Sequence, residues 1–359
     1  MKKIEIALRK FLLQLLLVLS RKPKQLPLNE LLPDSKILFI RLNRIGDALV
    51  TTPLLKLIKR NTNHKISVLA AKSNHFIFSS SDVCDEVIVF DKKKNGLFAL
   101  IKILKEKKFD AVIDLHDDVS STVSYIIAFL KCKYKFGLKK NTEKLYSHTI
   151  EKLDPTNNHV VDRLLHFSEL FGIKSNSNNL NIVFNPPSEY EKEASQFVNN
   201  HFKNKKFLVG INISAGSEAR FWGVDNYKKL IDELNFYDVN ILVMCVEKDI
   251  NYAMAIAGNS HPVFYNTSFN KFSTMISKID MLFTPDTSII HIGSAYKKPV
   301  FGLYVKYNTS DMIWSPYKSP FDCVITEEPT LKNVTFETVK EKYLPFFEKF
   351  YYEYSTKTD

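Results

Sequence analysis

One short segment near the start of the chain places a carboxylate close to two arginines and a glycine. The segment Arg41–Asp47 (RLNRIGD) follows a buried-strand pattern and precedes a helical one. Gly46 permits a tight turn and a close approach of a ligand to the backbone. Asp47 falls at the helix start, where the mouth of a cleft should lie, so it is a candidate catalytic residue. A carboxylate is also a favoured cap for the free N–H groups of a helix start, so the segment alone leaves both roles open.

Two segments in the second half of the chain are typical of anion binding. In Ser214–Trp222 (SAGSEARFW), small residues after a strand leave backbone N–H groups free for phosphate oxygens, and an arginine adds a fork-shaped cation. In Thr284–His291 (TPDTSIIH), hydroxyls and free N–H groups stand before a helix. The histidine of this segment either supports a diphosphate or stays neutral and packs. The candidate residues are Ser214, Ala215, Gly216, Arg220, Asp286, Thr287, Ser288 and His291.

Other kinds of chemistry find little support in the sequence. The chain has no GxxxxGK[ST] loop, no HExxH and no convincing DxD, and the cluster His116–Asp118 has no partner at metal-ligand spacing. We therefore expect no bound metal and no cofactor. The four cysteines form no CxxC pair, which favours a reducing compartment without disulfides. They are Cys84, Cys132, Cys245 and Cys323.

Alternating strand and helix patterns surround the candidate segments. Such an order predicts βαβ units and parallel sheets with helices on both faces. The polar stretch Ser175–Asn181 predicts a domain boundary. Two doubly wound domains facing each other would place a cleft at the carboxyl ends of both sheets, where ligands bind. Strands are expected at Lys36–Leu42, Lys65–Ala70, Glu86–Phe90, Ala111–Leu115, Phe207–Ile213, Asn240–Cys245, Met281–Thr284 and Pro299–Leu303. Helices are expected up to Arg60 after the first strand, and at Leu97–Lys107, Asn226–Leu234, Ser288–Tyr296 and Phe336–Tyr352.

Positive charge is concentrated in the first half of the chain. The 359 residues carry a net charge of +11, but residues 1–180 hold 31 Lys and Arg against 18 Asp and Glu. Residues 181–359 hold 19 against 21. This asymmetry indicates an anionic partner for the first half, which could be nucleic acid, an acidic membrane surface or an acidic substrate. A generally lysine-rich composition is the simpler alternative.

The first 24 residues predict an uncleaved amphipathic helix. Its apolar run, Phe11–Leu19, would span about 14 Å, which is half of a bilayer core. Cations around its ends suit an anionic membrane surface. A helix packed on its own protein or on a dimer partner remains the alternative. The cations are Lys2, Lys3, Arg9, Lys10, Arg21, Lys22 and Lys24.

Taken together, these segments resemble glycosyltransferase family 9, the lipopolysaccharide heptosyltransferases. ILFIRLNRIGDALVTTPLLKLIKR is similar to the opening signature of that family, and FDAVIDLH, KFGL and HVVDRLLHFSELFGI resemble its later first-domain landmarks. ISAGSEARFWGVDNYKKLI, TPDTSIIHIGSAYKKPVFGLY and MIWSPY are similar to its second-domain signatures. The resemblance covers roughly residues 36–330.

The resemblance implies a GT-B fold of the α/β class. It has two Rossmann-like doubly wound domains facing across a cleft, here with an extra N-terminal amphipathic helix. We expect that helix and its connector at 1–35, the acceptor-binding domain at 36–180 and the sugar-nucleotide-binding domain at 181–335. A C-terminal helix at 336–359 would follow, with the first domain as a candidate surface for it to pack on.

The same resemblance implies an inverting reaction in which Asp47 is the general base. Arg41 and Arg44 would stabilise its ionised form on the acceptor side, together with Gly46. Arg220 and the helix start at Asp286–His291 would stabilise the departing diphosphate, which explains why no metal is needed. Glu247 would face the nucleotide. Two departures put the exact sugar in doubt: Ser288 stands where many members have Gly, and Ser214–Gly216 replaces the common Asn-Pro-Gly opening.

The implied donor is ADP-heptose, and the implied acceptor is the lipid A–core oligosaccharide. The enzyme would then lie in the cytoplasm, peripheral on the anionic cytoplasmic face of the inner membrane, and would bind no nucleic acid. Transfer of a hexose from another nucleotide sugar to the same class of acceptor is the alternative reaction. A basic protein that binds nucleic acid or membrane without catalysis is the alternative class. The sequence does not indicate the oligomeric state.

Overall fold

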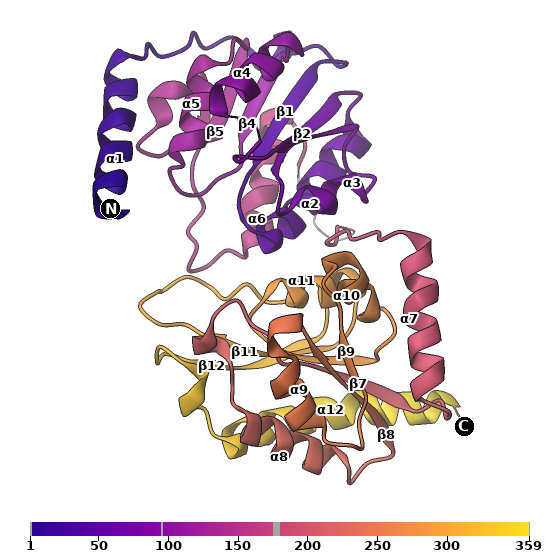
Figure 1. Ribbon diagram of the computed structural model, residues 1–359. Coiled ribbons are helices and arrows are strands. Elements are labelled where there is room, and N and C mark those ends of the chain that lie inside the picture. Colours follow the sequence, from indigo (N-terminus) through magenta and orange to yellow (C-terminus); the bar gives the residue numbers. More distant parts are fainter. Residues whose placement is uncertain (1, 95, 175–179, 359) are drawn as a thin grey trace. The chain divides into compact units, whose positions relative to one another are not determined.

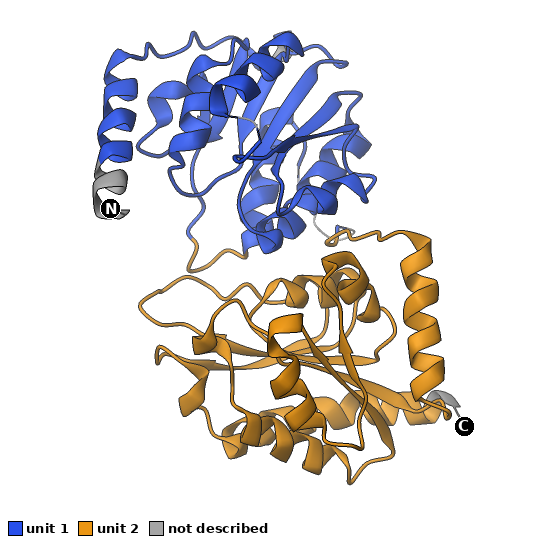
Figure 2. Cartoon of the chain, viewed as in Figure 1, with its two compact units in different colours: residues 1–154, 160–180 blue, residues 155–159, 181–359 orange. Residues whose placement is uncertain are grey.

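The chain folds into two compact units, each built around one parallel sheet. The computed structural model describes residues 2–94, 96–174 and 180–358. Unit 1 comprises residues 1–154 and 160–180, and unit 2 comprises residues 155–159 and 181–359 (Figure 2). The predicted boundary at Ser175–Asn181 falls largely on residues 175–179, outside the described residues. Nothing in the sequence patterns indicated that the short segment 155–159 belongs to the second unit.

Unit 1 holds a six-stranded sheet in which all neighbouring strands are parallel (Figure 1). The run KILFIR forms its central strand, and it is apolar on both faces because helices cover both sides of the sheet. The strand order is β3-β2-β1-β4-β5-β6, so the order reverses between β1 and β4. The strands are β1 (Lys36–Arg41), β2 (Lys65–Ala71), β3 (Glu86–Phe90), β4 (Ala111–Asp114), β5 (Tyr134–Leu138) and β6 (His148–Ile150).

Helices cover the two faces of this sheet in separate groups. One group packs on the side chains of Leu38 and Ile40, and it consists of α4 and α5. The N-terminal helix α1 packs against α5 from outside. The other group contains α2, which contacts α3 and α6. The helices are α1 (Lys2–Leu19), α2 (Ile45–Asn61), α3 (His75–Ser79), α4 (Leu97–Glu106), α5 (Ser121–Phe129) and α6 (Val160–Leu165).

Unit 2 repeats the same topology with a second parallel sheet. Its order is β12-β11-β10-β7-β8-β9, which reverses between β7 and β10. The fold class predicted from the sequence, two doubly wound Rossmann-like domains, is confirmed. The strands are β7 (Phe207–Asn212), β8 (Val239–Cys245), β9 (Val263–Tyr265), β10 (Met281–Pro285), β11 (Val300–Val305) and β12 (Phe321–Thr326). The helices are α7 (Ser188–His201), α8 (Val224–Leu234), α9 (Ile250–Ala257), α10 (Phe269–Met275), α11 (Ser288–Ala295) and α12 (Phe336–Thr358).

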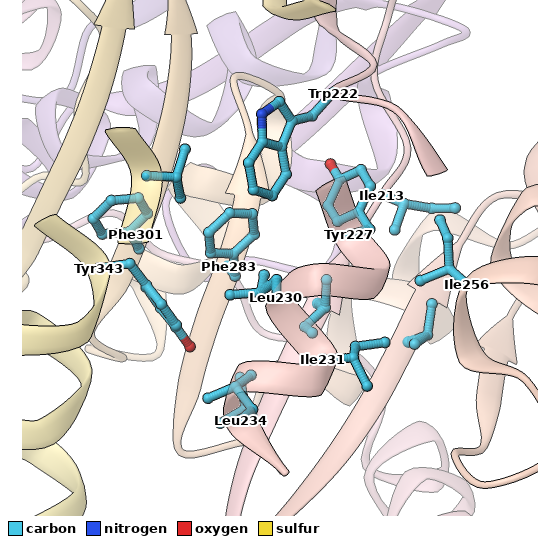
Figure 3. Close-up of a cluster of buried hydrophobic side chains, with 14 of the residues drawn as sticks. Ile213, Trp222, Tyr227, Leu230, Ile231, Leu234, Ile256, Phe283, Phe301 and Tyr343 are labelled. Atoms are coloured by element: carbon cyan, nitrogen blue, oxygen red, sulfur yellow. The ribbon is translucent and has the colours of Figure 1, made fainter. Parts of the chain in front are cut away.

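The last helix belongs to the core of unit 2. Tyr343 of α12 is fully buried and packs against Phe283 of β10 and Phe301 of β11, with ring centroids 5.3 and 5.2 Å away (Figure 3). Trp222 closes the same cluster, and its indole N–H donates to the Val334 carbonyl at 2.8 Å. The apolar stripe of α12 therefore completes the core of unit 2, whereas the sequence analysis named the first domain as a candidate surface.

These topologies decide where ligands can bind. In open α/β sheets, ligands bind outside the carboxyl ends of the strands, at the point where the strand order reverses. In unit 1 this point lies between β1 and β4, and in unit 2 between β7 and β10. The segments around Asp47, Ser214 and Asp286 follow three of these four strands. No helix in the described parts of the chain has an apolar stretch long enough to cross a bilayer.

Candidate functional site

Asp47 lies in the first turn of α2, just beyond the carboxyl end of β1. Its carboxylate accepts hydrogen bonds from the backbone N–H of Arg44 at 3.3 Å and from the side-chain amide of Asn43 at 3.4 Å. Arg41 Nη2 lies 3.1 Å from Asp47 Oδ1, and 15 % of the Asp47 side chain stays exposed. The carboxylate is therefore held in place by N–H donors while one part of it remains open to a ligand.

The two arginines of this segment differ in burial and in the contacts that they make. Arg41 is buried, and its guanidinium donates to the carbonyl oxygens of Leu115 and, at 3.2 Å, of Asp47. Arg41 thus ties the start of α2 to the residue that follows β4. Arg44 is exposed, and it offers Asp47 its backbone N–H.

The expectation that Gly46 makes a tight turn is wrong. The helix begins at Ile45, so Gly46 lies inside its first turn. Gly46 is not among the residues with a positive φ. The carboxylate at the third helical position bonds the N–H of the residue before the helix, which starts the helix without a glycine turn.

A buried charged cluster lies at the same edge of the unit 1 sheet. Asp114 accepts hydrogen bonds from His116 Nδ1 at 2.7 Å, from Lys140 Nζ at 2.8 Å and from the Tyr146 hydroxyl at 2.6 Å. The backbone N–H of Leu42 donates to His116 Nε2 at 3.2 Å, which requires the ring proton to be on Nδ1. The cluster therefore holds the loop that leads from β1 to the carboxylate of Asp47.

A glycine in β5 makes this cluster possible. A Cβ atom at Gly137 would meet the ring carbons of Tyr146 at 2.7 Å. Only glycine lets the tyrosine ring cross the strand and reach Asp114 with its hydroxyl. This gives a structural reason for the glycine in the KFGL segment.

Replacing Asp114 with Ala should destabilise unit 1 strongly. The change leaves the buried ammonium of Lys140 without its counter-charge, which typically costs about 3–5 kcal/mol. Burial alone would raise the pKa of Asp114, but the hydrogen bond from His116 and the charge and hydrogen bond of Lys140 hold it well below its usual range. The stabilisation is therefore present above the unfolded-state pKa of about 4 and is lost as the pH falls through the folded-state value. Urea denaturation should show the full difference in unfolding free energy at neutral pH and a smaller difference in acid.

Asp82 provides the matched control for this change. It is an exposed carboxylate of unit 1 that pairs with Lys59 at 2.8 Å. Exposed pairs contribute little, so Asp82→Ala should leave the unfolding free energy nearly unchanged. Equal stability of the Asp114→Ala and Asp82→Ala variants at neutral pH would contradict a stabilising role for the buried cluster.

Ser214, in the loop after β7, makes hydrogen bonds within the protein through both its backbone N–H and its hydroxyl. The N–H of Ser214 donates to Asn212 Oδ1 at 3.2 Å, and its hydroxyl donates to Asp249 Oδ2 at 2.7 Å. The expectation that the Ser214 N–H is free for phosphate is therefore wrong, because the side chain two residues earlier accepts it. The N–H groups of Ala215 and Gly216 have no acceptor among the described residues, so they remain candidate phosphate donors.

Glu247 lies at the same edge of the unit 2 sheet as this loop. It begins the short 3₁₀ helix Glu247–Asp249 after β8, and its side chain is exposed. The acidic residue that joins the loop is instead Asp249, through the hydroxyl of Ser214. The backbone N–H of Val246 donates to that same hydroxyl at 2.9 Å and completes the link between β7 and β8.

Arg220 and Asp286 come together across the point where the strand order of unit 2 reverses. Arg220 ends the 3₁₀ helix Glu218–Arg220, and its Nη1 donates to the Asp286 carbonyl at 3.0 Å. Its Nη2 lies 3.1 Å from the Asp286 carboxylate. Burial raises the pKa of Asp286, and the charge of Arg220 opposes that shift. About a third of Arg220 stays exposed, so the guanidinium can reach a ligand as well.

The start of α11 supplies further donors beside this pair. Thr287 caps the helix, and its hydroxyl oxygen accepts the Ile289 N–H at 3.2 Å. Ser288 is the first helical residue, where backbone N–H groups have no partner within the helix. The arrangement favours a negatively charged group at this end of the helix.

His291 is buried one turn into α11 and is neutral. Burial, reinforced by the neighbouring His159, lowers the pKa of His291 to about 3. Its Nδ1 atom is buried and has no hydrogen-bond partner among the described residues. The imidazole can therefore offer a ligand a hydrogen bond but no positive charge.

A cavity of about 690 Å³ opens beside the same loop. The rings of Phe221 and Tyr252 stack at its wall, with their centroids 5.0 Å apart. Among the residues predicted from the sequence, Ala215 is the one that lines it. Arg220, Asp286 and His291 are not among the residues that line the cavity.

Sequence reasoning did not identify the residues that support the site in unit 1, although it named His116 in a cluster that it rejected as a metal site. Asp114 ends β4, His116 lies just after it and Lys140 follows β5, so the separate sequence segments do not connect them. A usable signal was present, because a buried strand that ends in Asp-Leu-His places two titratable groups at the carboxyl edge of the sheet. No group of three or more His, Cys, Asp or Glu side chains among the described residues is arranged to hold a metal ion.

Comparison with known protein families identifies the kind of protein. The model of glycosyltransferase family 9 (heptosyltransferase) matches residues 97–344, which is more than half of the chain. This match begins after the segment that contains Asp47. A lipopolysaccharide core heptosyltransferase of Haemophilus influenzae, OpsX, is 24% identical over 231 residues. That alignment covers 62% of this chain and 65% of the relative, slightly less than two thirds of its length.

Solved structures show the same fold over nearly the whole chain. A family 9 glycosyltransferase from Veillonella parvula aligns with a TM-score of 0.76 and 17% identity, covering 92% of this chain and 99% of the other. The ADP-heptose lipopolysaccharide heptosyltransferase II of E. coli aligns with a TM-score of 0.70 and 16% identity, covering 89% and 99%. These likenesses establish the GT-B type of fold for this chain.

Proposed function

The chain belongs to glycosyltransferase family 9, and we propose that it transfers a heptose from ADP-heptose to the core of lipopolysaccharide with inversion at the anomeric carbon. Membership of the family makes it a glycosyltransferase. The observation that carries the proposal furthest is the pair formed by Arg220 and Asp286 at the carboxyl edge of unit 2, where α11 begins. The pair combines an accessible guanidinium with a helix start, which together suit a nucleoside diphosphate. His291, one turn further along α11, adds an imidazole nitrogen that has no partner among the described residues.

The donor is assigned to unit 2. Its diphosphate gains negative charge as the bond to the sugar breaks, and fixed donors that already point at that charge lower the barrier. Arg220 supplies a bidentate cation, and the N–H groups of Ala215 and Gly216 supply neutral donors. ADP-heptose is preferred over other nucleotide sugars because the E. coli relative of the same fold acts on it.

The acceptor is assigned to unit 1, with Asp47 as the general base. An acceptor hydroxyl oxygen attacks the anomeric carbon of the donor, and the bond from that carbon to the diphosphate oxygen breaks. The hydroxyl proton passes to the carboxylate of Asp47, and ADP leaves with the bonding electron pair. Arg41 holds the carboxylate from its buried side and leaves the open side for the acceptor.

The acceptor proposed here is the lipid A–core oligosaccharide at the cytoplasmic face of the inner membrane. OpsX is named for action on the lipopolysaccharide core, and this supports the same acceptor class. The inner core and lipid A are anionic, which suits the net positive charge of residues 1–180. Transfer of a hexose from another nucleotide donor to that acceptor is the alternative, because Ser288 departs from the usual glycine at the nucleotide site.

The test is a transfer reaction with defined donors. The full chain is incubated with a truncated lipopolysaccharide core and, in separate reactions, with ADP-heptose or a UDP-hexose, and the products are identified by mass spectrometry. We expect the mass of one heptose to be added from ADP-heptose alone. Addition of a hexose from the UDP-hexose and nothing from ADP-heptose would refute the proposed donor and leave the acceptor class standing.

A further inference from the structure

The N-terminal helix α1 presents an apolar face that no described part of the chain covers. Leu13 is 8 % exposed, and Leu17 packs with it toward the core around α4 and α5. The opposite side chains are between 41 % and 73 % exposed. They are Leu8, Phe11, Leu12, Leu15, Val18 and Leu19, here called the outer face of α1.

The spacing of the outer face shows that it is one continuous surface. Its members follow each other at three- and four-residue steps, which places them in a single stripe along the helix. Contiguous apolar patches of this kind on a soluble protein mark sites of interaction. Helix α1 is apolar on two sides, and one of these sides packs against the rest of unit 1.

Contacts at the end of α1 and in the connector after it hold the helix against the rest of unit 1. Ser20 ends the helix, with its N–H and its hydroxyl bonded to the Leu16 carbonyl at 2.9 and 2.7 Å. The Tyr134 hydroxyl donates to the carbonyl of Pro27 at 2.9 Å, which fixes the connector that follows. Lys144 Nζ lies 3.3 Å from the Val18 carbonyl. The outer face is therefore presented by an anchored helix.

Exposed cations lie within the helix and directly after it, and they indicate which kind of partner can bind the outer face. Within the helix, Lys10 is exposed next to Phe11. The connector adds three more exposed cations directly after the helix: Arg21, Lys22 and Lys24. A second copy of this surface would bring like charges together. An anionic surface instead satisfies the cations and the apolar stripe at the same time.

We propose that the outer face of α1 docks on an anionic phospholipid membrane, with the helix lying in the plane of the headgroups. The inference rests on the proposed function, since a lipid-linked acceptor is what would bring unit 1 to a membrane. The apolar side chains enter the headgroup–acyl boundary, and the lysines and arginines extend their charges to the phosphates. The helix lies on the bilayer because its apolar stretch is too short to cross one.

The experiment measures flotation of the full chain with vesicles. One vesicle is phosphatidylcholine with phosphatidylglycerol, and the other is phosphatidylcholine alone. We expect binding to the anionic vesicles that is more than about tenfold stronger and that weakens with salt. The double variant Phe11→Ser/Leu15→Ser should lower that binding by more than about tenfold. Both side chains are exposed, so the fold should survive.

A matched variant removes an exposed aromatic ring elsewhere. Phe236 in unit 2 is 85 % exposed, and Phe236→Ser should bind the vesicles like the wild type. Equal flotation of the Phe11→Ser/Leu15→Ser variant and the wild type would overturn the proposal, as would failure of the full chain to float. A lipid-free dimer that the same double variant dissociates would show that a second copy is the occupant.

Transfer assays separate this inference from the proposed function. The Phe11→Ser/Leu15→Ser variant should act normally on a deacylated, soluble core acceptor and poorly on an acceptor embedded in anionic vesicles. If the wild type transfers sugar to neither acceptor, the proposed function fails, and the flotation result still decides the docking surface. If the double variant uses both acceptors equally well, docking through α1 is wrong and the proposed function stands.

Discussion

Replacing Asp47 with Ala should lower kcat by about 10²–10⁴-fold while ADP still binds to unit 2. The loss follows from removing the group that takes the acceptor proton during attack on the anomeric carbon. ADP affinity should be unchanged because the proposed donor residues all lie in unit 2. Steady-state kinetics with ADP-heptose and a soluble core acceptor give kcat, and calorimetry with ADP gives the affinity.

A purely structural role of Asp47 predicts different behaviour. The carboxylate also bonds the Arg44 N–H at the start of α2, and losing such a contact typically costs about 1 kcal/mol of stability. Glu337 in the first turn of α12 is a matched acidic residue without a proposed catalytic role, so Glu337→Ala should keep a normal kcat. The Asp47→Asn variant should fold like the wild type and lose kcat to about the same extent as Asp47→Ala, because an amide cannot take the acceptor proton. A normal kcat in that variant would remove Asp47 from the mechanism.

Replacing Arg220 with Ala should lower kcat/KM by about 10²–10³-fold. Arg220 is the accessible cation beside the start of α11, and the negative charge on the diphosphate grows as the sugar leaves. Arg220→Lys should recover only part of the rate, because an ammonium keeps the charge but loses the bidentate geometry. The rates are measured with ADP-heptose and the soluble acceptor, as for Asp47.

Lys206 is the control for the loss of a cation in unit 2. Its side chain is as exposed as that of Arg220 and pairs with Asp238, but it lies just before the amino end of β7. Lys206→Ala should therefore leave kcat/KM near the wild-type value. A comparable loss in both variants would show that the general charge of unit 2 matters, and not the group formed by Arg220 and Asp286.

The fold could be predicted because its longer strands are apolar on both faces. Runs such as ILFI in β1 and ILVMC in β8 stand out from the helical patterns between them. Two strands that the sequence analysis did not predict, β6 and β9, have only three residues each. Strand periodicity cannot be recognised over so short a stretch. The other two strands that the sequence analysis did not predict are longer: β5 (YKFGL) contains a lysine, which is buried, and β12 (FDCVIT) is an edge strand whose first and fifth residues are exposed.

The positions of the candidate sites could be predicted from the sequence, but the hydrogen bonds within them could not. The carboxyl edges of the sheets follow from the strand order, and this places Asp47 and Arg220 at the expected edges. Whether a backbone N–H is free depends on neighbours such as Asn212, whose side chain accepts the N–H of Ser214. The packing of α12 in the core of unit 2 was not predicted for a similar reason, because an apolar stripe does not show which hydrophobic core it packs against.

The most direct test of the proposed reaction is the anomeric configuration of its product. The wild-type enzyme is given ADP-heptose of known configuration and a soluble core acceptor, and the new linkage is assigned by NMR. A single displacement with Asp47 as base predicts a product of inverted configuration at the transferred heptose. A product with retained configuration would contradict the account, because it would require a route other than direct attack of the acceptor hydroxyl on the donor.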